Sequence, residues 1–188
     1  MRHKYATNGI VLARYPLGEA ASLIVLLTSE FGLIRVRAQG LRKPGAKLAS
    51  ALQVLSQSDI VLIHAKDGWR LTGALLERAW FQDLPQITHE RAGRTASLLL
   101  RLVRGESSDP ALLTSYLEYL SVLTSLTEEE HDAAECLSAL HILHILGFDA
   151  GTLPGTNGEY SSEVLKEVQD NRQDIILRIN RGLQASGM

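Results

Sequence analysis

A cluster of positive charges is the part of this sequence with the clearest chemical potential. The stretch from Ile34 to Lys47 holds five cationic residues and no Asp or Glu. These are Arg35, Arg37, Arg42, Lys43 and Lys47. Guanidinium and ammonium groups without acidic neighbours are typical of phosphate-binding surfaces. We therefore predict that these five residues contact a polyanion, although a solvated strand and basic turn would have the same composition.

The same stretch matches a nucleotide-binding loop only in part. Ala46 separates Gly45 from Lys47, and Leu48 stands where a metal-binding hydroxyl residue would be needed. The sequence therefore does not predict an ATPase. It also contains no nucleophile elbow, paired-histidine zinc motif or dinucleotide fingerprint. We expect a protein that is not an enzyme and needs no cofactor.

A second group of arginines recurs at helical spacing between Pro85 and Arg104, opposite the apolar positions. Its members are Arg91, Arg94, Arg101 and Arg104. We interpret them as a docking face for phosphates or for an acidic partner. An ordinary solvated helix face is the alternative.

Other reactive side chains give weaker signals. His131, His141, His144 and Cys136 do not match the spacing of zinc sites, so no metal is predicted. Glu135 follows His131 by four residues and is expected to pair with it along a helix. Four aromatic residues are expected to fill or cover a barrel more than to stack on bases: Tyr5, Tyr15, Trp69 and Trp80. Nucleic acid would then be held mainly by its phosphates, leaving its bases free to pair.

Composition and charge narrow the class of protein. The chain has 188 residues and one cysteine, Cys136, which excludes an internal disulfide. Its apolar runs are too short for a membrane span or a signal peptide, so we expect a cytoplasmic, nucleoid-associated protein. Residues 1–78 carry 11 Lys/Arg and 5 Asp/Glu, whereas residues 79–188 carry 8 and 16. This asymmetry predicts two modules with different partners.

The elements that must position these residues change character near residue 80. Short alternating or β-branched runs predict five strands, at 9–14, 22–28, 33–39, 54–64 and 69–77. Turns are expected at Tyr15 to Gly18, at Ser29 to Gly32 and at Asp67-Gly68, and a helical turn at Leu48 to Leu52. Five strands with a basic connection after the third predict a barrel of the OB type, with an SH3-like barrel as second choice.

Beyond Phe81 the hydrophobic period becomes helical. Helices are predicted from Pro85 to Arg104, from Pro110 to Leu123, from a capping box at Thr127 to Gly147, and from Ser161 to about Gly182. The fold class is therefore α+β, with an OB barrel in residues 1–80 and an all-α helical domain in residues 81–188. From the charge asymmetry we expect the first domain to bind a polyanion and the second to bind other partners.

Several segments of the barrel half carry a family resemblance. They are Gly9-Ile10-Val11-Leu12, Gly18-Glu19, Leu23 to Thr28, Glu30-Phe31-Gly32, Ala38-Gln39-Gly40-Leu41-Arg42-Lys43, Lys47-Leu48 and Leu52-Gln53. In these the chain resembles the bacterial recombination mediator RecO, most specifically over residues 8–53. Leu143 to Phe148 is also similar to the end of that family's central helix.

The resemblance implies an OB domain followed by a helical domain. It implies binding of single- and double-stranded DNA, annealing of complementary strands, and help in loading recombinase onto coated single strands without nucleotide hydrolysis. The implied partners are a RecR-like protein and the acidic tail of single-stranded-DNA-binding protein. Arg42, Lys43 and Lys47 match the family's basic loop, whereas Arg35 and Arg37 are added from the strand pattern alone.

The sequence departs from the family in two ways. Many members carry four zinc cysteines after the Gly-Phe position, but Asp149 to Tyr160 contains none, so we expect a short, zinc-free variant. The chain is also shorter at its C-terminus, which would alter the region that receives the acidic tail. Two other functions remain open: an adaptor that binds RecR or the acidic tail with little DNA affinity, and an RNA-binding OB module.

Overall fold

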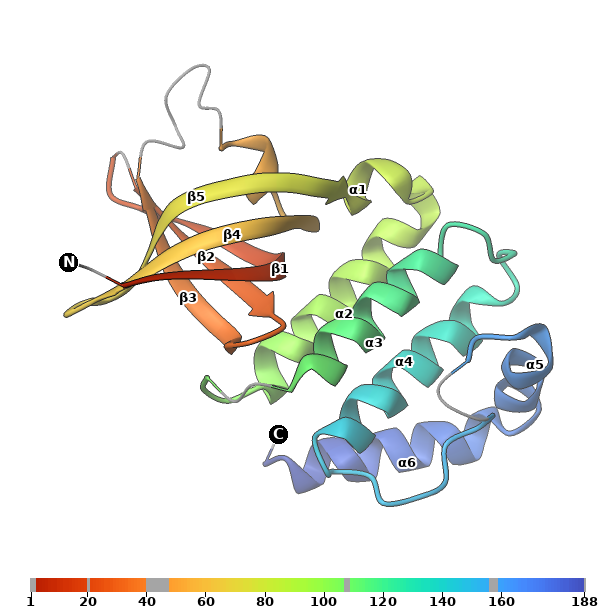
Figure 1. Cartoon of the computed structure of the whole chain (residues 1–188). Helices are drawn as coiled ribbons and strands as arrows, with labels where there is room; N and C mark the ends of the chain where they lie inside the picture. Colours follow the sequence, from red (N-terminus) through yellow and green to blue (C-terminus); the bar gives the residue numbers. More distant parts are fainter. Residues whose placement is uncertain (1–2, 20, 40–47, 107–108, 156–158, 188) are drawn as a thin grey trace. The chain divides into compact units, whose positions relative to one another are not determined.

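The chain forms two compact units in this computed structural model, which describes residues 3–19, 21–39, 48–106, 109–155 and 159–187 (Figure 1). The first unit comprises residues 1–83 and 104–113, and the second comprises residues 84–103 and 114–188. The first is built from strands and the second from helices. The fold class is thus α+β, as predicted.

Five strands close the first unit into a barrel, in the order β1-β2-β3-β5-β4. Their bounds are β1 Lys4–Leu17, β2 Ala21–Thr28, β3 Gly32–Gln39, β4 Ser56–Ala65 and β5 Gly68–Ala79. Neighbours are antiparallel except β3 and β5, which pair in parallel. This is the five-stranded arrangement of an OB fold, so the barrel prediction is confirmed and the SH3-like alternative is wrong.

Strand β1 is much longer than the predicted 9–14. Its first half pairs with β4 and its second half with β2, with an irregularity between Val11 and Ala13. A bulge of this kind bends a strand so that it can serve two neighbours and close a barrel. The predicted turn at Tyr15 to Gly18 is therefore wrong, because pairing continues to Leu17 and the chain turns after it.

Two of the predicted turns are confirmed. Gly32 has φ +63°, the left-handed conformation expected at the β2–β3 connection. Strands β4 and β5 are joined through Lys66 and Asp67, because Ala65 pairs with Gly68, whose φ is +101°. The helical turn after the basic stretch is also present, as a short 3-10 helix at Ser50–Leu52.

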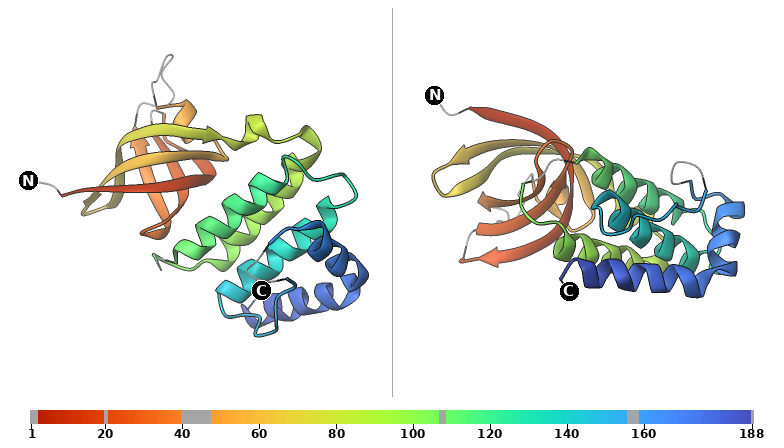
Figure 2. Two further views of the ribbon diagram at one scale, coloured as in Figure 1. Left: turned by 45° about the vertical axis from the view of Figure 1, so that its right-hand side comes forward. Right: turned by 90° about the horizontal axis from the view of Figure 1, so that it is seen from below.

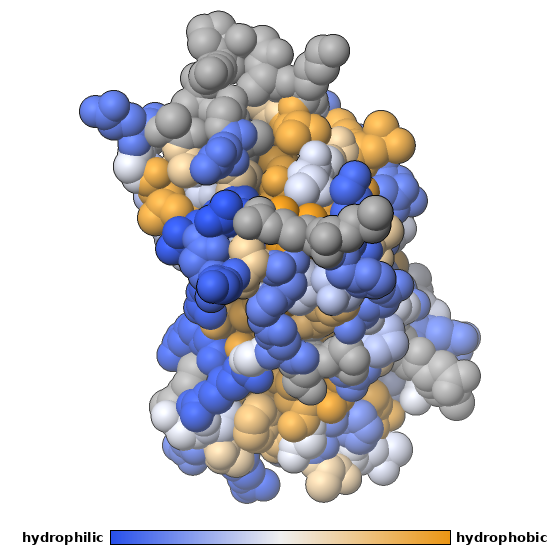
Figure 3. All heavy atoms as spheres, turned by 60° about the vertical axis from the view of Figure 1, so that its left-hand side comes forward, coloured by the Kyte–Doolittle hydropathy of each residue, from blue (hydrophilic) through white to orange (hydrophobic). Residues whose placement is uncertain are grey.

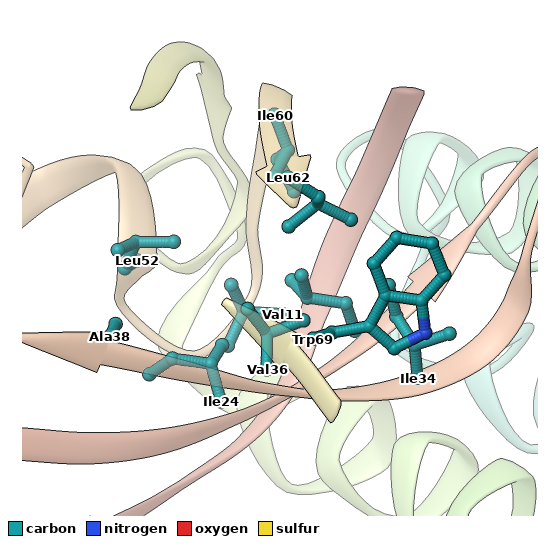
Figure 4. Packing of buried hydrophobic residues seen from close by; sticks show 10 residues of the cluster. Val11, Ile24, Ile34, Val36, Ala38, Leu52, Ile60, Leu62 and Trp69 are labelled. Atoms are coloured by element: carbon teal, nitrogen blue, oxygen red, sulfur yellow. The ribbon is translucent and has the colours of Figure 1, made fainter. Parts of the chain in front are cut away.

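The barrel interior is filled by aliphatic side chains from every strand and by one indole (Figure 4). The fully enclosed members include Val11, Ile24, Val36 and Leu62, and Trp69 lies among them with 7% of its surface exposed. Trp80 is likewise buried and donates from Nε1 to Gln57 Oε1 at 3.1 Å. Both tryptophans are therefore structural, as the sequence indicated.

The helical elements are α1 Trp80–Asp83, α2 His89–Leu102, α3 Pro110–Val122, α4 His131–Ile145, α5 Ser162–Asp170 and α6 Arg172–Ala185. The predicted helix at 85–104 is shorter than expected, because a 3-10 turn at Gln86–Thr88 precedes α2. The predicted last helix is two helices that meet at Asn171. Ser161 caps α5 as expected, accepting from the Val164 N–H at 3.3 Å.

Helix α4 is the central helix of the second unit, packing against α2, α5 and α6 (Figure 2). It ends in a turn where Gly147 has φ +76° and the Phe148 N–H donates to the Leu143 carbonyl at 2.8 Å. Its predicted capping box is only half formed. Glu130 accepts from the Thr127 N–H, but the Thr127 hydroxyl donates to the same carboxylate in place of capping a backbone N–H.

Among the described residues, no helix has the length and apolar content needed to cross a bilayer.

Candidate nucleic-acid interface

The two predicted arginines of β3 lie on the outer surface of the barrel. Buried and exposed residues alternate along this strand, with Ile34, Val36 and Ala38 inside and Arg35 and Arg37 outside. This confirms the alternation read from the sequence. The other three predicted cations, Arg42, Lys43 and Lys47, lie outside the described residues.

Strand pairing places further side chains in register with Arg37. Tyr15 on β1 pairs with Leu23 on β2, Leu23 pairs with Arg37, and Arg37 pairs with Arg70 on β5. Paired residues project to the same face of a sheet, so these four form one row across the barrel. Tyr15 is 51% exposed. We call five residues of this region the arginine face: Tyr15, Arg35, Arg37 and Gln39, which are exposed, and Arg70, which is partly exposed.

Arg37 and Arg70 share one carboxylate. Asp67, on the β4–β5 turn, accepts from Arg37 Nη1 at 3.2 Å and from Arg70 Nη2 at 2.7 Å through the same oxygen, Oδ2. The hydrogen bond from Arg70 is the largest cause that lowers the pKa of Asp67. All three side chains remain between 37% and 49% exposed. Arg35 makes no ion pair with any residue in the described part of the chain.

Acidic groups gather elsewhere on the barrel. Asn8 on β1 donates from Nδ2 to Asp59 on β4 and to Glu77 on β5, at 3.1 and 2.7 Å. Neither carboxylate belongs to the rows that carry Arg35 and Arg37. A polyanion would therefore be attracted to the arginine face and repelled from the β4–β5 surface around Asp59. Hydrophilic and apolar side chains are interspersed on the face drawn in Figure 3.

Most of the barrel aromatics support one another and are not available to bases. Tyr5, Phe31 and Trp69 form a mutual cluster with ring centroids 5.1 to 5.7 Å apart. The Trp69 indole donates to Glu106 Oε1 at 2.9 Å. Tyr15 is the exception to the expectation of buried aromatics, since half of its surface faces solvent.

The four predicted arginines of this region divide into two pairs: Arg91 and Arg94 within α2, and Arg101 and Arg104 at and beyond its end. Arg91 and Arg94 both bind Glu135 of α4, with shortest contacts of 2.6 Å each, and Arg94 also binds Glu90. These contacts raise the pKa of Arg94, chiefly through the hydrogen bond to Glu135. The predicted pairing of Glu135 with His131 is therefore wrong. The cause is tertiary packing, which brings two guanidinium groups of α2 onto the carboxylate.

Arg101 and Arg104 are both exposed. Arg101 borders a shallow hollow on the surface of α2 together with Leu98, Ser97, Gly93 and Arg94. Arg101 makes no ion pair with another described residue. The proposed acidic docking face is thus reduced to this end of α2, because the guanidinium groups of Arg91 and Arg94 already have carboxylate partners.

The histidines do not form a metal site in the described residues, where no three His, Cys, Asp or Glu side chains are grouped to hold an ion. His131 and His141 are buried side chains of α4. Burial, with a smaller contribution from nearby His144, lowers the pKa of His141 to about 4. His141 is therefore an uncharged part of the helical core at neutral pH.

Comparison with known proteins identifies the barrel. The family model for the N-terminal part of recombination protein O, RecO, matches residues 1–73. Over these 73 residues the chain is similar to the RecO N-terminal family. Proteins named DNA repair protein RecO are similar to this chain over 38–53% of its length. That of Gloeobacter violaceus is 36% identical over 87 residues, 45% of this chain and 33% of the relative.

Two further RecO proteins are similar to this chain over a comparable length. The protein of Synechococcus elongatus is 41% identical over 71 residues, 38% of this chain and 27% of its own length. That of Gloeothece citriformis is 29% identical over 100 residues, 53% of this chain and 34% of its own. The chain thus matches about a third of the length of these RecO proteins, and the resemblance read from residues 8–53 is confirmed.

Sequence reasoning missed Arg70 of the arginine face and Asp67, the carboxylate that Arg70 shares with Arg37. Arg70 and its partner Asp67 lie about 30 residues beyond Arg37 and join it only through the parallel pairing of β3 with β5. The sequence did offer one clue. A two-residue hairpin at Lys66-Asp67 fixes where β5 begins, and in an OB barrel the start of β5 lies beside β3.

Proposed function

We propose that this chain is a DNA-binding recombination mediator that anneals complementary single strands and helps to load recombinase onto coated single-stranded DNA. The observation that carries the proposal is the arginine face on a RecO-type barrel, with Arg35 and Arg37 exposed on β3 and Arg70 partly exposed on the neighbouring β5. Its relatives are named as DNA repair proteins. Arg42, Lys43 and Lys47, which lie outside the described residues, are proposed to bind DNA as well.

The proposed mode of binding is phosphate contact along the strand. Arginine forks bind phosphate oxygens whatever the base sequence, and most of the barrel aromatics are engaged with one another. A strand held in this way exposes its base edges to a second strand. Annealing would follow without nucleotide hydrolysis, because pairing itself supplies the free energy.

The helical unit is proposed to bind protein partners: a RecR-like protein or the acidic tail of single-stranded-DNA-binding protein. The exposed Arg101 beside Leu98 gives α2 a site where a carboxylate and an apolar side chain of one peptide could bind together. An adaptor that uses only such contacts is the second candidate function. It would form these complexes while ignoring free DNA at moderate salt.

The decisive experiment is titration of labelled single-stranded DNA at several salt concentrations, followed by addition of the complementary strand. With about four phosphate contacts, log K against log salt should have a slope of about −3. The triple variant Arg42→Ala, Lys43→Ala, Lys47→Ala should flatten the slope and weaken binding to all sequences alike. A control with equal charge loss replaces three exposed cations outside this stretch, Lys4, Lys166 and Arg181.

The proposal fails if the two triple variants bind and anneal equally well. Retention of partner binding by a chain that never binds DNA would favour the adaptor. A preference for RNA of the same length and sequence would favour an RNA-binding module.

A further inference from the structure

A cleft opens on the barrel where β3 and β5 part. The two strands pair only at Val36–Trp69 and Arg37–Arg70. Beyond these pairs they diverge, and a space of about 430 Å³ lies between them. Its described lining comes from all five strands and from Leu48, the residue after the basic stretch.

The chemistry of this cleft is divided between an apolar lining and a cationic pair. Leu17, Leu48, Ile63 and Leu71 supply aliphatic surface, and Leu48 and Leu71 also pack against the barrel core. The two guanidinium groups, from Arg37 and Arg70, are in register with each other. A ligand with a planar apolar group and a phosphate at one end could pack against the aliphatic lining and bind the two arginines.

One polar side chain of the cleft is available to recognise such a ligand. Thr72 uses its hydroxyl to donate to the Val61 carbonyl at 3.0 Å. Gln39 is exposed at the end of β3, and its amide makes no hydrogen bond with another residue in the described ranges. A carboxamide carries both donors and an acceptor, which suits the edge of a nucleobase.

Asp67 occupies the position that a phosphate would take between the two arginines. Its Oδ2 lies 3.2 Å from Arg37 Nη1 and 2.7 Å from Arg70 Nη2, which keeps both groups directed at one point. Exposed ion pairs of this kind are weak in water. A nucleic-acid phosphate can therefore compete with Asp67 or share the pair with it.

We propose that this cleft binds one nucleotide of a single-stranded DNA, with the base on the aliphatic surface beside Gln39 and the phosphate between Arg37 and Arg70, and that Asp67 weakens this binding by competing for the arginines. The inference deepens the proposed function and rests on it. It adds a single anchored nucleotide to a strand otherwise held by its phosphates.

The test compares two matched arginines of β5. Arg70 and Arg78 are 40% and 41% exposed, and each binds one aspartate at 2.7 Å, Asp67 and Asp83 respectively. Only Arg70 lines the cleft. Arg70→Ala should weaken binding of a labelled oligothymidylate about tenfold and reduce the salt slope by about 0.7, whereas Arg78→Ala should leave both unchanged.

The aspartate partners of these two arginines provide a second matched comparison, in which loss of the cleft aspartate should strengthen DNA binding. Asp67→Asn should strengthen binding about threefold to tenfold, and Asp83→Asn should not. In a second measurement, thymidine monophosphate should shift the methyl NMR signals of Leu17, Ile63 and Leu71 in the parent chain and not in Arg70→Ala. Circular dichroism would establish that each variant is folded.

Two outcomes would overturn the inference and leave the proposed function standing. One is equal loss of affinity in Arg70→Ala and Arg78→Ala, and the other is no gain in Asp67→Asn, in a chain that binds single-stranded DNA. Absence of DNA binding by the parent chain at low salt would instead refute the proposed function, and this inference with it.

Discussion

Glu135 on α4 and Arg94 on α2 form a bidentate ion pair, in which Nε and Nη2 of the guanidinium donate to the two carboxylate oxygens at 2.6 and 2.7 Å. Arg91 donates to the same carboxylate at 2.6 Å. Glu135 is only 20% exposed. One carboxylate therefore bridges two cations that would otherwise repel each other on the surface of α2.

Replacing Glu135 should destabilise the helical unit. Glu135→Gln removes the carboxylate that binds both guanidinium groups and leaves them only the exposed Glu90 and the more distant Asp132, so we expect a loss of about 1–3 kcal/mol after allowance for solvent screening. Urea unfolding followed by circular dichroism measures this loss. Glu118→Gln makes the same charge change at an exposed position of α3 and should cost less than about 0.5 kcal/mol. Equal effects of the two variants would contradict the structural role of Glu135.

Acid should weaken the contact between Asp149 and Arg178. Arg178 donates from Nε and Nη2 to the two oxygens of Asp149, at 3.1 and 2.6 Å, and this contact lowers the pKa of the carboxyl. A lowered folded-state pKa means that the stabilisation is present above the unfolded value of about 3.9 and is lost as the pH falls through the folded value.

The variant Asp149→Asn should therefore be less stable than the parent by about 2 kcal/mol at pH 7. The difference should shrink below about pH 4, where the parent carboxyl also becomes protonated. Denaturant unfolding at several pH values measures both effects. Asp170→Asn, at an exposed position of α5, is the control. A difference that stays constant down to pH 2 would refute the assignment.

His141 should also make the stability of the helical unit depend on pH. Its pKa is lowered to about 4 by burial, so the unfolded chain, with a histidine pKa of about 6.5, binds the proton first as the pH falls. Between about pH 6.5 and pH 4 the helical unit should lose up to about 3 kcal/mol of stability from this residue. His141→Gln removes the titrating group and should flatten the slope of stability against pH. An unchanged slope would mean that His141 is not buried in its neutral form.

Two glycine replacements should change the stability of the protein in opposite directions. A Cβ at Gly9 would lie 2.8 Å from the Leu27 carbonyl oxygen, so Gly9→Ala should push β1 from β2 and cost about 1–3 kcal/mol. A Cβ at Gly93, within α2, would have no neighbour in the described structure within 4 Å. Gly93→Ala should stabilise the helix by about 0.5–1 kcal/mol. Thermal unfolding of both variants tests this prediction. Melting temperatures that shift in the same direction would contradict it.

Local features of this protein were predictable because short-range sterics and alternation determine them. The outward positions of Arg35 and Arg37, the left-handed Gly32 and the cap at Ser161 all follow from a few neighbouring residues. The family resemblance supplied the order in which the strands join. The pattern alone left the OB and SH3-like barrels as alternatives.

Long-range ion pairs could not be predicted in the same way. Arg37 and Asp67 are 30 residues apart, and Arg91 and Glu135 are 44 residues apart. Nothing in the spacing of these charges distinguishes a carboxylate that binds an arginine across the fold from one that faces water. The length of β1 escaped prediction for a related reason, because the second strand that it joins lies far along the chain.

The hydrogen bond from Trp69 to Glu106 has a practical consequence for exchanging parts between relatives. Glu106 follows α2 in the chain, yet its carboxylate accepts the indole proton of a barrel residue. A chimaera with a single crossover point at the end of β5 would combine the tryptophan of one parent with an unmatched residue from the other. Exchange of this barrel therefore requires a second, short graft at residues 104–113, and the fluorescence of Trp69 would report whether the graft has restored its acceptor.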